Sequence, residues 1–330
     1  MQHRAQITNA YTQNGTYDYS DCFHYVKPEF KNNDLVIGNL EVTLGGKPYT
    51  GYPAFSAPDE YLEAIHKAGF NVLTTANNHC LDRRKSGLER TINLLDSLRI
   101  PHAGTYRDRQ ERSQQYPLLI EEKGFRIALL NYTYGTNGIP VTPPNIVNYI
   151  DKEQIRKDIL KARLMKPDAI IACIHWGIEY QSLPRKEEQD LANWMIHLGV
   201  SHIIGTHPHV IQPITVVTDS ITHKQHVIAY SLGNFISNMS APQTDGGLAI
   251  KLVLRKVENW TRLESCYYSF IWTSRPTLNK NKKFQVYPSS INDNLLNNNE
   301  KKILERYLKT ARELIEKHSQ GVKEYFFKRN

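Results

Sequence analysis

The fold is decided by one stretch of the sequence, Ser201-His202-Ile203-Ile204-Gly205-Thr206-His207-Pro208-His209-Val210. The β-branched apolar residues before Gly205 predict a short buried strand. His207 and His209 follow it, and in extended backbone two side chains two positions apart point the same way. Two imidazoles that face one way beyond a strand can bind a metal ion. They can equally make ordinary hydrogen bonds in a polar loop, so the rest of the sequence has to decide between these readings.

Strand-like and helix-like segments alternate along the chain, which is the pattern of a layered α/β fold. We expect strands at residues 34–37, 70–75, 118–120, 126–130, 168–174, 202–204, 227–232 and 248–254. We expect helices at residues 58–68, 86–98, 152–165, 187–198 and 299–318. After about residue 274 the composition shifts to Asn, Lys and Pro, which predicts an irregular connector. The expected organisation is therefore one domain over residues 1–273, followed over residues 274–330 by the connector and an amphipathic C-terminal helix packed on that domain.

The bulk properties restrict the class of partner. The 330 residues carry a net charge of +8, which suits acidic partners such as phosphate or a polyanionic polymer. No zinc-finger spacing, RNA-binding aromatic signature or arginine-rich arm is present, so we expect no nucleic acid partner. No apolar run reaches a membrane-spanning length, and the N-terminal residues lack the apolar core of a signal peptide. We therefore expect neither a transmembrane segment nor an export signal in this chain.

Polar residues that can bind metal follow each of five predicted strands of the main sheet. They are Gly38-Asn39-Leu40-Glu41, Ala76-Asn77-Asn78-His79-Cys80-Leu81-Asp82, His175-Trp176-Gly177, Gly205-Thr206-His207-Pro208-His209 and Gly233-Asn234-Phe235. In open α/β sheets, ligands bind beyond the carboxyl ends of the strands. Any one cluster can be an ordinary turn or cap. Five on one edge of a sheet predict a shared functional site.

The residue types in these clusters indicate a specific chemistry. Histidine and carboxylate ligands, with an Asn oxygen, suit Zn, Mn or Fe better than Ca or Mg. Two such ions about 3.5–4 Å apart can activate water and hold the attacking and leaving oxygens in phosphate-ester hydrolysis. His79 lies beside Asn78 and could protonate the leaving group. Asp82, three residues further on, could orient the His79 ring.

In their order and type, these clusters resemble those of the poly-γ-glutamate capsule biosynthesis protein family (CapA-like), whose fold is similar to that of calcineurin-like metallophosphoesterases. The resemblance covers roughly residues 1–255. It implies a four-layered α/β/β/α sandwich around a site for divalent metal ions, two of them by the phosphoesterase pattern. By that pattern, one ion is bound by Asn78, His175 and His207. Glu41 or Asn39 would bridge the two ions, and His209 would bind the other.

The chain departs from the family pattern in two places. The family begins with a buried strand that ends in Gly-Asp, whose Asp is a metal ligand, and this chain starts at Met1 just after that point. We therefore expect the first strand to be missing. Asn39 stands where phosphoesterases carry a bridging Asp after Gly, and Glu41 is the candidate to substitute for it. His3 is a further candidate to reach the site from the N-terminal side.

Two functions remain open from the sequence. The first is a metal-dependent hydrolase of a phosphoester or related bond in capsule or cell-envelope polymer metabolism. The second is a non-catalytic envelope protein that binds or helps export an anionic polymer such as poly-γ-glutamate. The partners implied are an anionic polymer or phosphorylated substrate, together with other capsule-synthesis proteins. By resemblance alone, the location is the cell envelope or the extracytoplasmic space.

Overall fold

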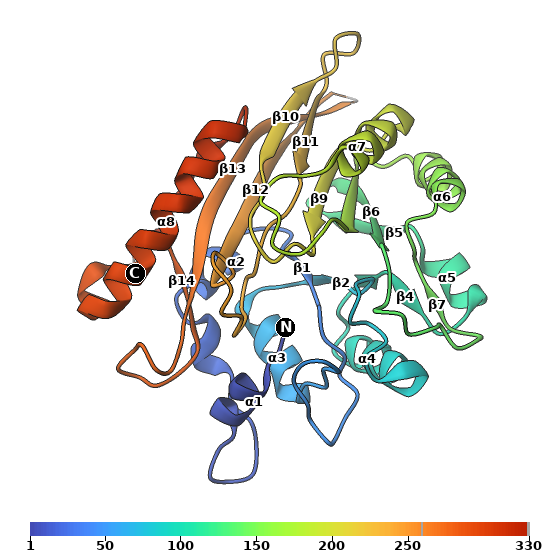
Figure 1. The fold of residues 1–330 in the computed structure, drawn as a ribbon. Coiled ribbons are helices and arrows are strands. Elements are labelled where there is room, and N and C mark those ends of the chain that lie inside the picture. Colours follow the sequence, from blue (N-terminus) through green and yellow to red (C-terminus); the bar gives the residue numbers. More distant parts are fainter. Residues whose placement is uncertain (259, 329–330) are drawn as a thin grey trace.

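The computed structural model describes residues 1–258 and 260–328 and has a mixed α/β fold with several sheets (Figure 1). Eight α-helices and two short 3-10 helices occur among these residues. The helices are α1 (Arg4–Ala10), η1 (Ser20–Phe23), α2 (Lys27–Lys31), α3 (Asp59–Ala68), α4 (Arg84–Ser97), α5 (Arg109–Gln115), α6 (Lys152–Leu164), α7 (Lys186–Leu198), η2 (Asp293–Leu295) and α8 (Asn298–His318).

The largest sheet has six strands in the order β10-β11-β9-β8-β6-β5. They are β5 (Leu118–Glu122), β6 (Phe125–Thr133), β8 (Ala169–His175), β9 (His202–Thr206), β10 (Ile214–Thr218) and β11 (Gln225–Ala229). The four central strands, β6, β8, β9 and β11, are parallel, and β5 and β10 are antiparallel to their neighbours. Helices α6 and α7 pack on this sheet through the same apolar cluster as β6 and β8, because each presents an apolar side to it.

A separate three-stranded parallel sheet, in the order β1-β2-β3, holds the first two strand-end clusters. Its strands are β1 (Ile37–Asn39), β2 (Val72–Thr74) and β3 (His102–Ala103). The expectation that all five clusters follow one sheet is therefore wrong. The two sheets meet at Asn131 of β6, whose side chain accepts a hydrogen bond from the Ala76 amide (2.8 Å) and donates one to the Cys173 carbonyl (3.0 Å). This junction brings the carboxyl ends of both sheets to the same place.

A third sheet is built from the last part of the chain. It contains β12 (Gly246–Val257), β13 (Trp260–Ser274), β14 (Gln285–Pro288) and the short β15 (Lys323–Glu324). One apolar cluster joins this sheet to β10 and β11 on one side and to α8 on the other. Figure 1 shows α8 lying along the outer side of β13. A small pair, β4 (Thr105–Tyr106) with β7 (Ile146–Val147), completes the strands.

The predicted helices match α3, α4, α6, α7 and α8 within two residues at each end. The strands differ more, because their bounds depend on pairing partners that the sequence does not reveal. Residues 34–36 were predicted as strand, but the pairing of β1 with β2 begins only at Ile37. Residues 230–232 were also predicted as strand, but the pairing of β11 with β9 ends at Ala229. The predicted irregular connector contains β14, which pairs with the unpredicted fifteen-residue strand β13. Within the described residues, no helix has the length and apolar character needed to cross a membrane.

Candidate metal centre

The eight residues predicted for the site converge at the junction of the two parallel sheets. Asn39 ends β1 and Glu41 follows it, the loop after β2 carries Asn78, His79 and Asp82, His175 ends β8, and His207 and His209 follow β9. All except the half-buried Asn39 are buried. A group of charged and polar side chains this deeply buried requires partners, since burial without compensation is costly.

Glu41, His207 and His209 form the core of this group. Their potential ligand atoms all lie within 4.8 Å of one another. The same oxygen, Glu41 Oε1, lies 3.6 Å from His175 Nε2 and 3.9 Å from His209 Nε2. The ring centroids of His175 and His207 are 4.9 Å apart. Three imidazoles therefore surround one carboxylate.

The backbone conformation that places the two histidines after β9 in the site differs from the predicted one. Their backbone is not extended, because φ is +107° at His207 and +60° at His209. Gly205, just before this turn, packs against the chain that leaves β11, and a Cβ there would lie 2.0 Å from the Tyr230 carbonyl oxygen. The close approach explains why the position is a glycine. The strained turn then directs both rings to one side, with centroids 5.9 Å apart.

Hydrogen bonds fix the orientation of the histidine rings. His175 contacts Thr206 Oγ1 through Nδ1 (2.9 Å) and Asn78 Oδ1 through Nε2 (2.9 Å). His209 Nδ1 lies 3.1 Å from Asn234 Oδ1. The bond at His209 Nδ1 orients that ring and leaves Nε2 for an ion, whereas both nitrogens of His175 are already engaged.

A chain of amides holds Glu41. Asn77 Nδ2 donates to Asn39 Oδ1 (3.2 Å), and Asn39 Nδ2 donates to Glu41 Oε2 (3.4 Å). Oε2 is thereby engaged, and Oε1 is the oxygen that faces the histidines. Asn39 therefore contacts the carboxylate.

His79 and Asp82 form a pair beside the core group. His79 Nδ1 lies 2.8 Å from Asp82 Oδ2, which also accepts a hydrogen bond from the Phe55 amide (2.8 Å). The Phe55 ring packs edge-on against His79, with centroids 4.6 Å apart. His3 contacts the same Phe55 ring at 5.4 Å. The pair is rigid, and Nε2 is the His79 nitrogen left for proton exchange.

The protonation state of the site suits metal binding. Burial, followed by the neighbouring histidines, lowers the pKa of His175 well below its usual value. Burial, followed by His209 and His79, lowers the pKa of His207 to about 3. These imidazoles are neutral at physiological pH, which is the form that binds metal.

Two buried atoms of the core group have no hydrogen-bond partner among the described residues. They are Glu41 Oε1 and His207 Nδ1. Unpartnered buried polar atoms are uncommon in proteins, and a bound ion is one way to satisfy two of them that lie in one group. A carboxylate oxygen and an unpartnered neutral imidazole nitrogen are donors that a divalent transition metal accepts, so the residues fit such an ion.

Four further residues border the site, and one of them, Asn234, belongs to the fifth predicted strand-end cluster. Glu179 Oε1 lies 4.0 Å from His209 Nε2, and Asn234 positions the other side of the same ring. The Tyr134 ring is 4.4 Å from His207, and the Tyr180 ring is 6.5 Å from His209. Both tyrosines are about half exposed, so they form an aromatic rim. The rim lies in the loops after β6 and β8, where sequence gives no periodic signal.

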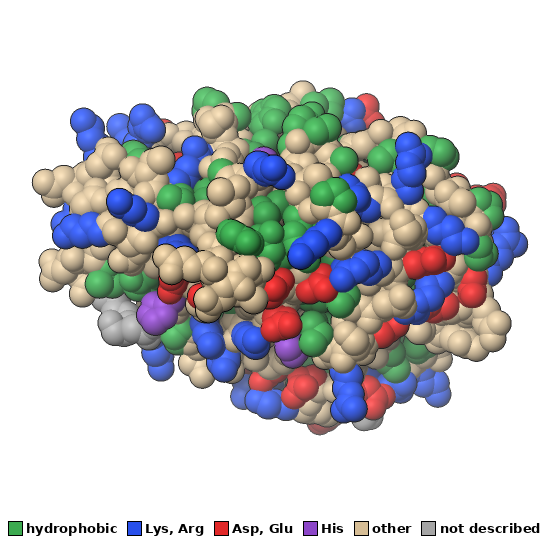
Figure 2. Space-filling model, turned by 90° about the horizontal axis from the view of Figure 1, so that it is seen from below, with side chains coloured by type: hydrophobic (Ala, Val, Ile, Leu, Met, Phe, Trp, Pro, Cys, Tyr) green, Lys and Arg blue, Asp and Glu red, His purple; other side chains and the backbone are tan. Residues whose placement is uncertain are grey.

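Basic residues do not gather at one place on the face drawn in Figure 2. Lys and Arg side chains are spread across it, with Asp and Glu among them. A continuous basic stripe is the feature expected of a nucleic-acid-binding surface. This face has none.

The sequence is similar to proteins of capsule synthesis. Residues 1–239 match the family described as bacterial capsule synthesis protein PGA_cap. The capsule biosynthesis protein CapA of Bacillus anthracis is 30% identical over 268 residues, which cover 77% of this chain and 61% of that protein. The PGA biosynthesis protein CapA of Bacillus subtilis (strain 168) is 28% identical over 256 residues, covering 71% of this chain and 61% of that protein.

The chain thus spans about 61% of the length of these two curated relatives. Among solved structures, a 5'-nucleotidase from Candida albicans SC5314 covers 74% of this chain and 42% of its own, at 13% identity and a TM-score of 0.35. A likeness this low carries no argument about activity. The family match over residues 1–239 extends through every residue of the site, and it shows that this chain belongs to the bacterial capsule synthesis protein family PGA_cap.

Proposed function

We propose that this protein is a metal-dependent hydrolase of a phosphoester or related bond in capsule or cell-envelope polymer metabolism. One observation carries the proposal. The buried group Glu41, His207 and His209 contains an unpartnered carboxylate oxygen and an unpartnered imidazole nitrogen. Beside it lies a histidine–carboxylate pair, His79 with Asp82, of the kind that transfers protons in hydrolases.

In this proposal Glu41, His207 and His209 bind the first ion, which is Mn, Zn or Fe by the nature of its ligands. His175 Nε2 and Asn78 Oδ1 form a hydrogen bond with each other. This bond would have to break before either atom could bind a metal ion. They are the candidates to complete the site or to form a second one. Asn39 supports Glu41 and is not itself a ligand.

The metal would supply a Lewis acid that polarises the scissile bond and makes water a nucleophile near neutral pH. The side chains of the protein would transfer the proton and position the substrate. Asp82 holds the His79 Nδ1–H, so His79 Nε2 can donate a proton to the leaving oxygen. Tyr134 and Tyr180 are half exposed beside His207 and His209, and they would contact the part of the substrate that does not react.

The finer structural assignment is also a proposal. The apolar clusters join α6 and α7 to the six-stranded sheet, that sheet to β12–β13, and β13 to α8. Such stacking supports a four-layered α/β/β/α sandwich of the metallophosphoesterase type. We further propose residues 1–273 as the family domain and residues 274–330 as its C-terminal appendage. We place the protein at the cell envelope, acting on an anionic polymer or a phosphorylated precursor beside other capsule-synthesis proteins.

The experiment compares metal content and turnover. The wild-type protein and His207→Ala are dialysed, their Mn, Zn and Fe are measured by mass spectrometry, and both are assayed on phosphomonoesters, phosphodiesters and anionic polymer. We expect stoichiometric metal and turnover in the wild type, and loss of both in His207→Ala. Full metal without turnover on any substrate would refute the hydrolase. It would support the alternative, a non-catalytic protein that binds or helps export an anionic polymer.

A further inference from the structure

A cavity lies at the end of the six-stranded sheet that is opposite to the metal centre. It has a volume of about 390 Å³ and is lined by the first residues of β9 and β11 and by the paired ends of β12 and β13. His202 begins β9 and His207 follows its end. At roughly 3.3 Å per residue, the length of this strand puts ~13 Å between the cavity and the metal centre. The cavity is therefore separate from the site already described.

His202 is a buried polar side chain in the wall of this cavity, with only 2% of its surface exposed. Its Nδ1 accepts a hydrogen bond from the Val227 amide (3.2 Å). A backbone amide can only donate, so the hydrogen of the neutral His202 ring lies on Nε2. Burial, followed by the nearby His226, lowers the pKa of His202 to about 3, and the ring is neutral at physiological pH. Among the described residues this Nε2–H has no acceptor, so it is a donor available to a ligand.

The charged side chains of the cavity lining leave a positive balance. Lys224 and Arg262 belong to the lining, and among the described residues neither has a carboxylate oxygen within 4.0 Å. The two carboxylates of the lining, Asp168 and Glu264, are each paired with a basic residue outside it, at 2.9 and 3.1 Å. The lining therefore carries two cations that no carboxylate neutralises.

These groups do not favour a metal ion. A metal needs a lone pair on the imidazole nitrogen, and His202 Nε2 carries a hydrogen because Val227 occupies Nδ1. In the part of the chain that the structure describes, the one group of three metal-binding side chains within 4.8 Å of one another is that of the metal centre. A donor beside two cations is instead the arrangement that binds an anion.

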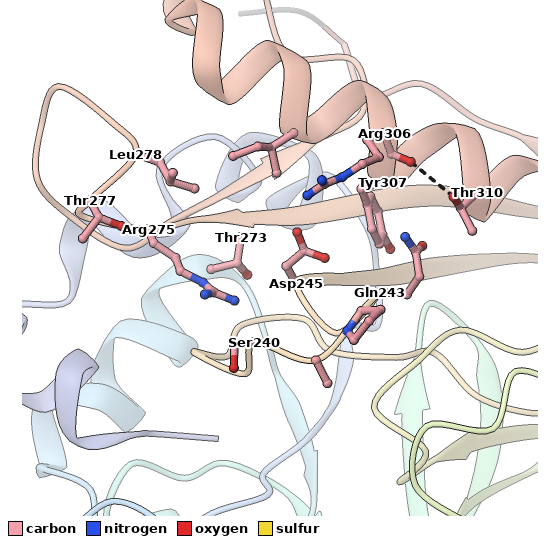
Figure 3. A pocket seen from close by; sticks show the side chains of 13 residues that line it. Ser240, Gln243, Asp245, Thr273, Arg275, Thr277, Leu278, Arg306, Tyr307 and Thr310 are labelled. Atoms are coloured by element: carbon pink, nitrogen blue, oxygen red, sulfur yellow. Dashed lines mark hydrogen bonds between the residues drawn. The ribbon is translucent and has the colours of Figure 1, made fainter.

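The larger cavity of the molecule lacks such a buried donor. Figure 3 shows it between the loop before β12, the end of β13 and α8, with a volume of about 550 Å³. Its buried polar side chains, Thr273 and Tyr307, already donate to backbone carbonyl oxygens (3.3 and 3.4 Å). Among the described residues, the smaller cavity is therefore the one whose buried side chain still needs a partner.

An aromatic side chain forms a further part of the smaller cavity. Trp260 begins β13, lines the cavity and is 48% exposed. An indole face that is accessible in this way can stack on a planar ring of a ligand.

We propose that this cavity binds a small phosphate monoester that carries a planar ring, of the nucleoside monophosphate type. His202 Nε2–H, Lys224 and Arg262 would bind the phosphate, and Trp260 would stack on the ring. A phosphate monoester carries a charge of about −1.5 to −2 at pH 7, which matches two unpaired cations better than a single carboxylate does. This binding role goes beyond the proposed hydrolase and does not depend on it, because the ligand lies at the other end of the strands.

The test is calorimetric titration of the full chain with AMP, adenosine and ribose 5-phosphate, in chelator so that no probe is hydrolysed. We expect AMP to bind at least tenfold more tightly than either other probe, since adenosine lacks the anion and ribose 5-phosphate lacks the ring. Arg262→Gln should weaken AMP binding roughly tenfold. Arg109→Gln is the matched control, because it makes the same charge change at an exposed position of α5 outside the cavity lining. Trp260→Leu should reduce the affinity for AMP to that for ribose 5-phosphate.

Absence of AMP binding, or equal affinity of Arg262→Gln and wild type, would overturn the proposal. Equal weakening by Arg109→Gln would overturn it as well, because binding would then reflect net charge. Adenosine that binds as tightly as AMP would refute the role of the phosphate, and ribose 5-phosphate that does so would refute the role of the ring. His207→Ala should bind AMP like the wild type, and a loss there would assign AMP to the metal centre. Arg262 and Trp260 are exposed, and thermal unfolding checks that the variants fold like the wild type.

Discussion

Replacing Glu41 by Gln should stabilise the metal-free protein and destabilise the metal-bound one. The Glu41 side chain is only 10% exposed, and its Oε1 has no hydrogen-bond partner among the described residues. Gln has nearly the same shape, and its carbonyl oxygen can still accept from Asn39 Nδ2. The substitution removes a buried carboxylate that faces imidazoles and also interacts electrostatically with the buried N-terminus of Met1.

The size of the effect follows from that geometry. A buried, unsatisfied polar group costs about 1–3 kcal/mol, and more when it is charged. Without metal, we therefore expect Glu41→Gln to raise the free energy of unfolding by about 1–3 kcal/mol. At about 2 °C per kcal/mol for a chain of this size, the midpoint rises by roughly 2–6 °C. With metal at a thousand times its dissociation constant, the wild type gains about 4.1 kcal/mol, which the variant largely loses.

The assay is thermal unfolding with chelator and with excess Mn²⁺ or Zn²⁺. Glu41→Gln should have the higher unfolding midpoint in chelator, and the wild type should have the higher midpoint with excess metal. Glu305→Gln, an exposed position of α8, provides the same charge change as a control. If Glu41→Gln showed the same metal-induced shift as wild type, Glu41 would not be a ligand. A lower midpoint in chelator would show that the carboxylate has a partner in the metal-free protein.

Three more outcomes are expected. His79→Ala should leave metal content unchanged, measured by mass spectrometry, and lower turnover by about 10²–10⁴-fold, the usual contribution of general acid catalysis; loss of the metal would make His79 a ligand instead. Gly205→Ala should lower the unfolding free energy by roughly 1–3 kcal/mol, because its Cβ would lie 2.0 Å from the Tyr230 carbonyl oxygen. Gly135→Ala, with nothing within 4 Å, is the control, and equal midpoints would refute the close packing. The free energy of unfolding of the metal-free protein should fall as the pH drops from about 6.5 toward 3. In this range His207 binds a proton in the unfolded state but not in the folded state, where its pKa is about 3. Unfolding free energies from denaturant titrations at several pH values measure this, and a pH dependence of His207→Gln equal to that of wild type would contradict it.

Sequence reasoning selected candidate residues that lie together in the structure, but it did not predict the two-sheet framework that holds them. Each cluster was identifiable because its residues follow an apolar β-branched run, a local signal. The division into two sheets was not, because strands such as β1 and β2 have three residues each and carry no mark of their partners. At the junction, the side chain of Asn131 bonds to segments 55 and 42 residues away in sequence, and an apolar cluster joins Val72 and Ala103 to the larger sheet.

The convergence of His207 and His209 was predicted for the wrong reason. Alternation in a strand would place both rings on one side, but β9 ends at Thr206 and both residues have positive φ. Non-glycine residues adopt this conformation at a cost, and they keep it only where the surroundings require it. The backbone turn, set by the packing of Gly205 on Tyr230, therefore produces the arrangement that the periodicity appeared to explain. The rim residues Tyr134, Glu179 and Tyr180 lie in loops, where no such periodicity exists.

The proposal of Glu41 rather than Asn39 as the ligand rests on the structure. The sequence left either one as the bridging residue, because both follow the same strand. Asn77 donates to the Asn39 oxygen, and that bond fixes which end of the Asn39 amide faces Glu41. The end that faces it is the NH₂ group, a donor, which cannot bind a cation. An Asp at position 39 would place a second carboxylate about 3.4 Å from the first, whereas Asn supplies a hydrogen bond there. In the proposed site, Glu41 is therefore the ligand, and the Asn39 amide two residues before it orients its carboxylate.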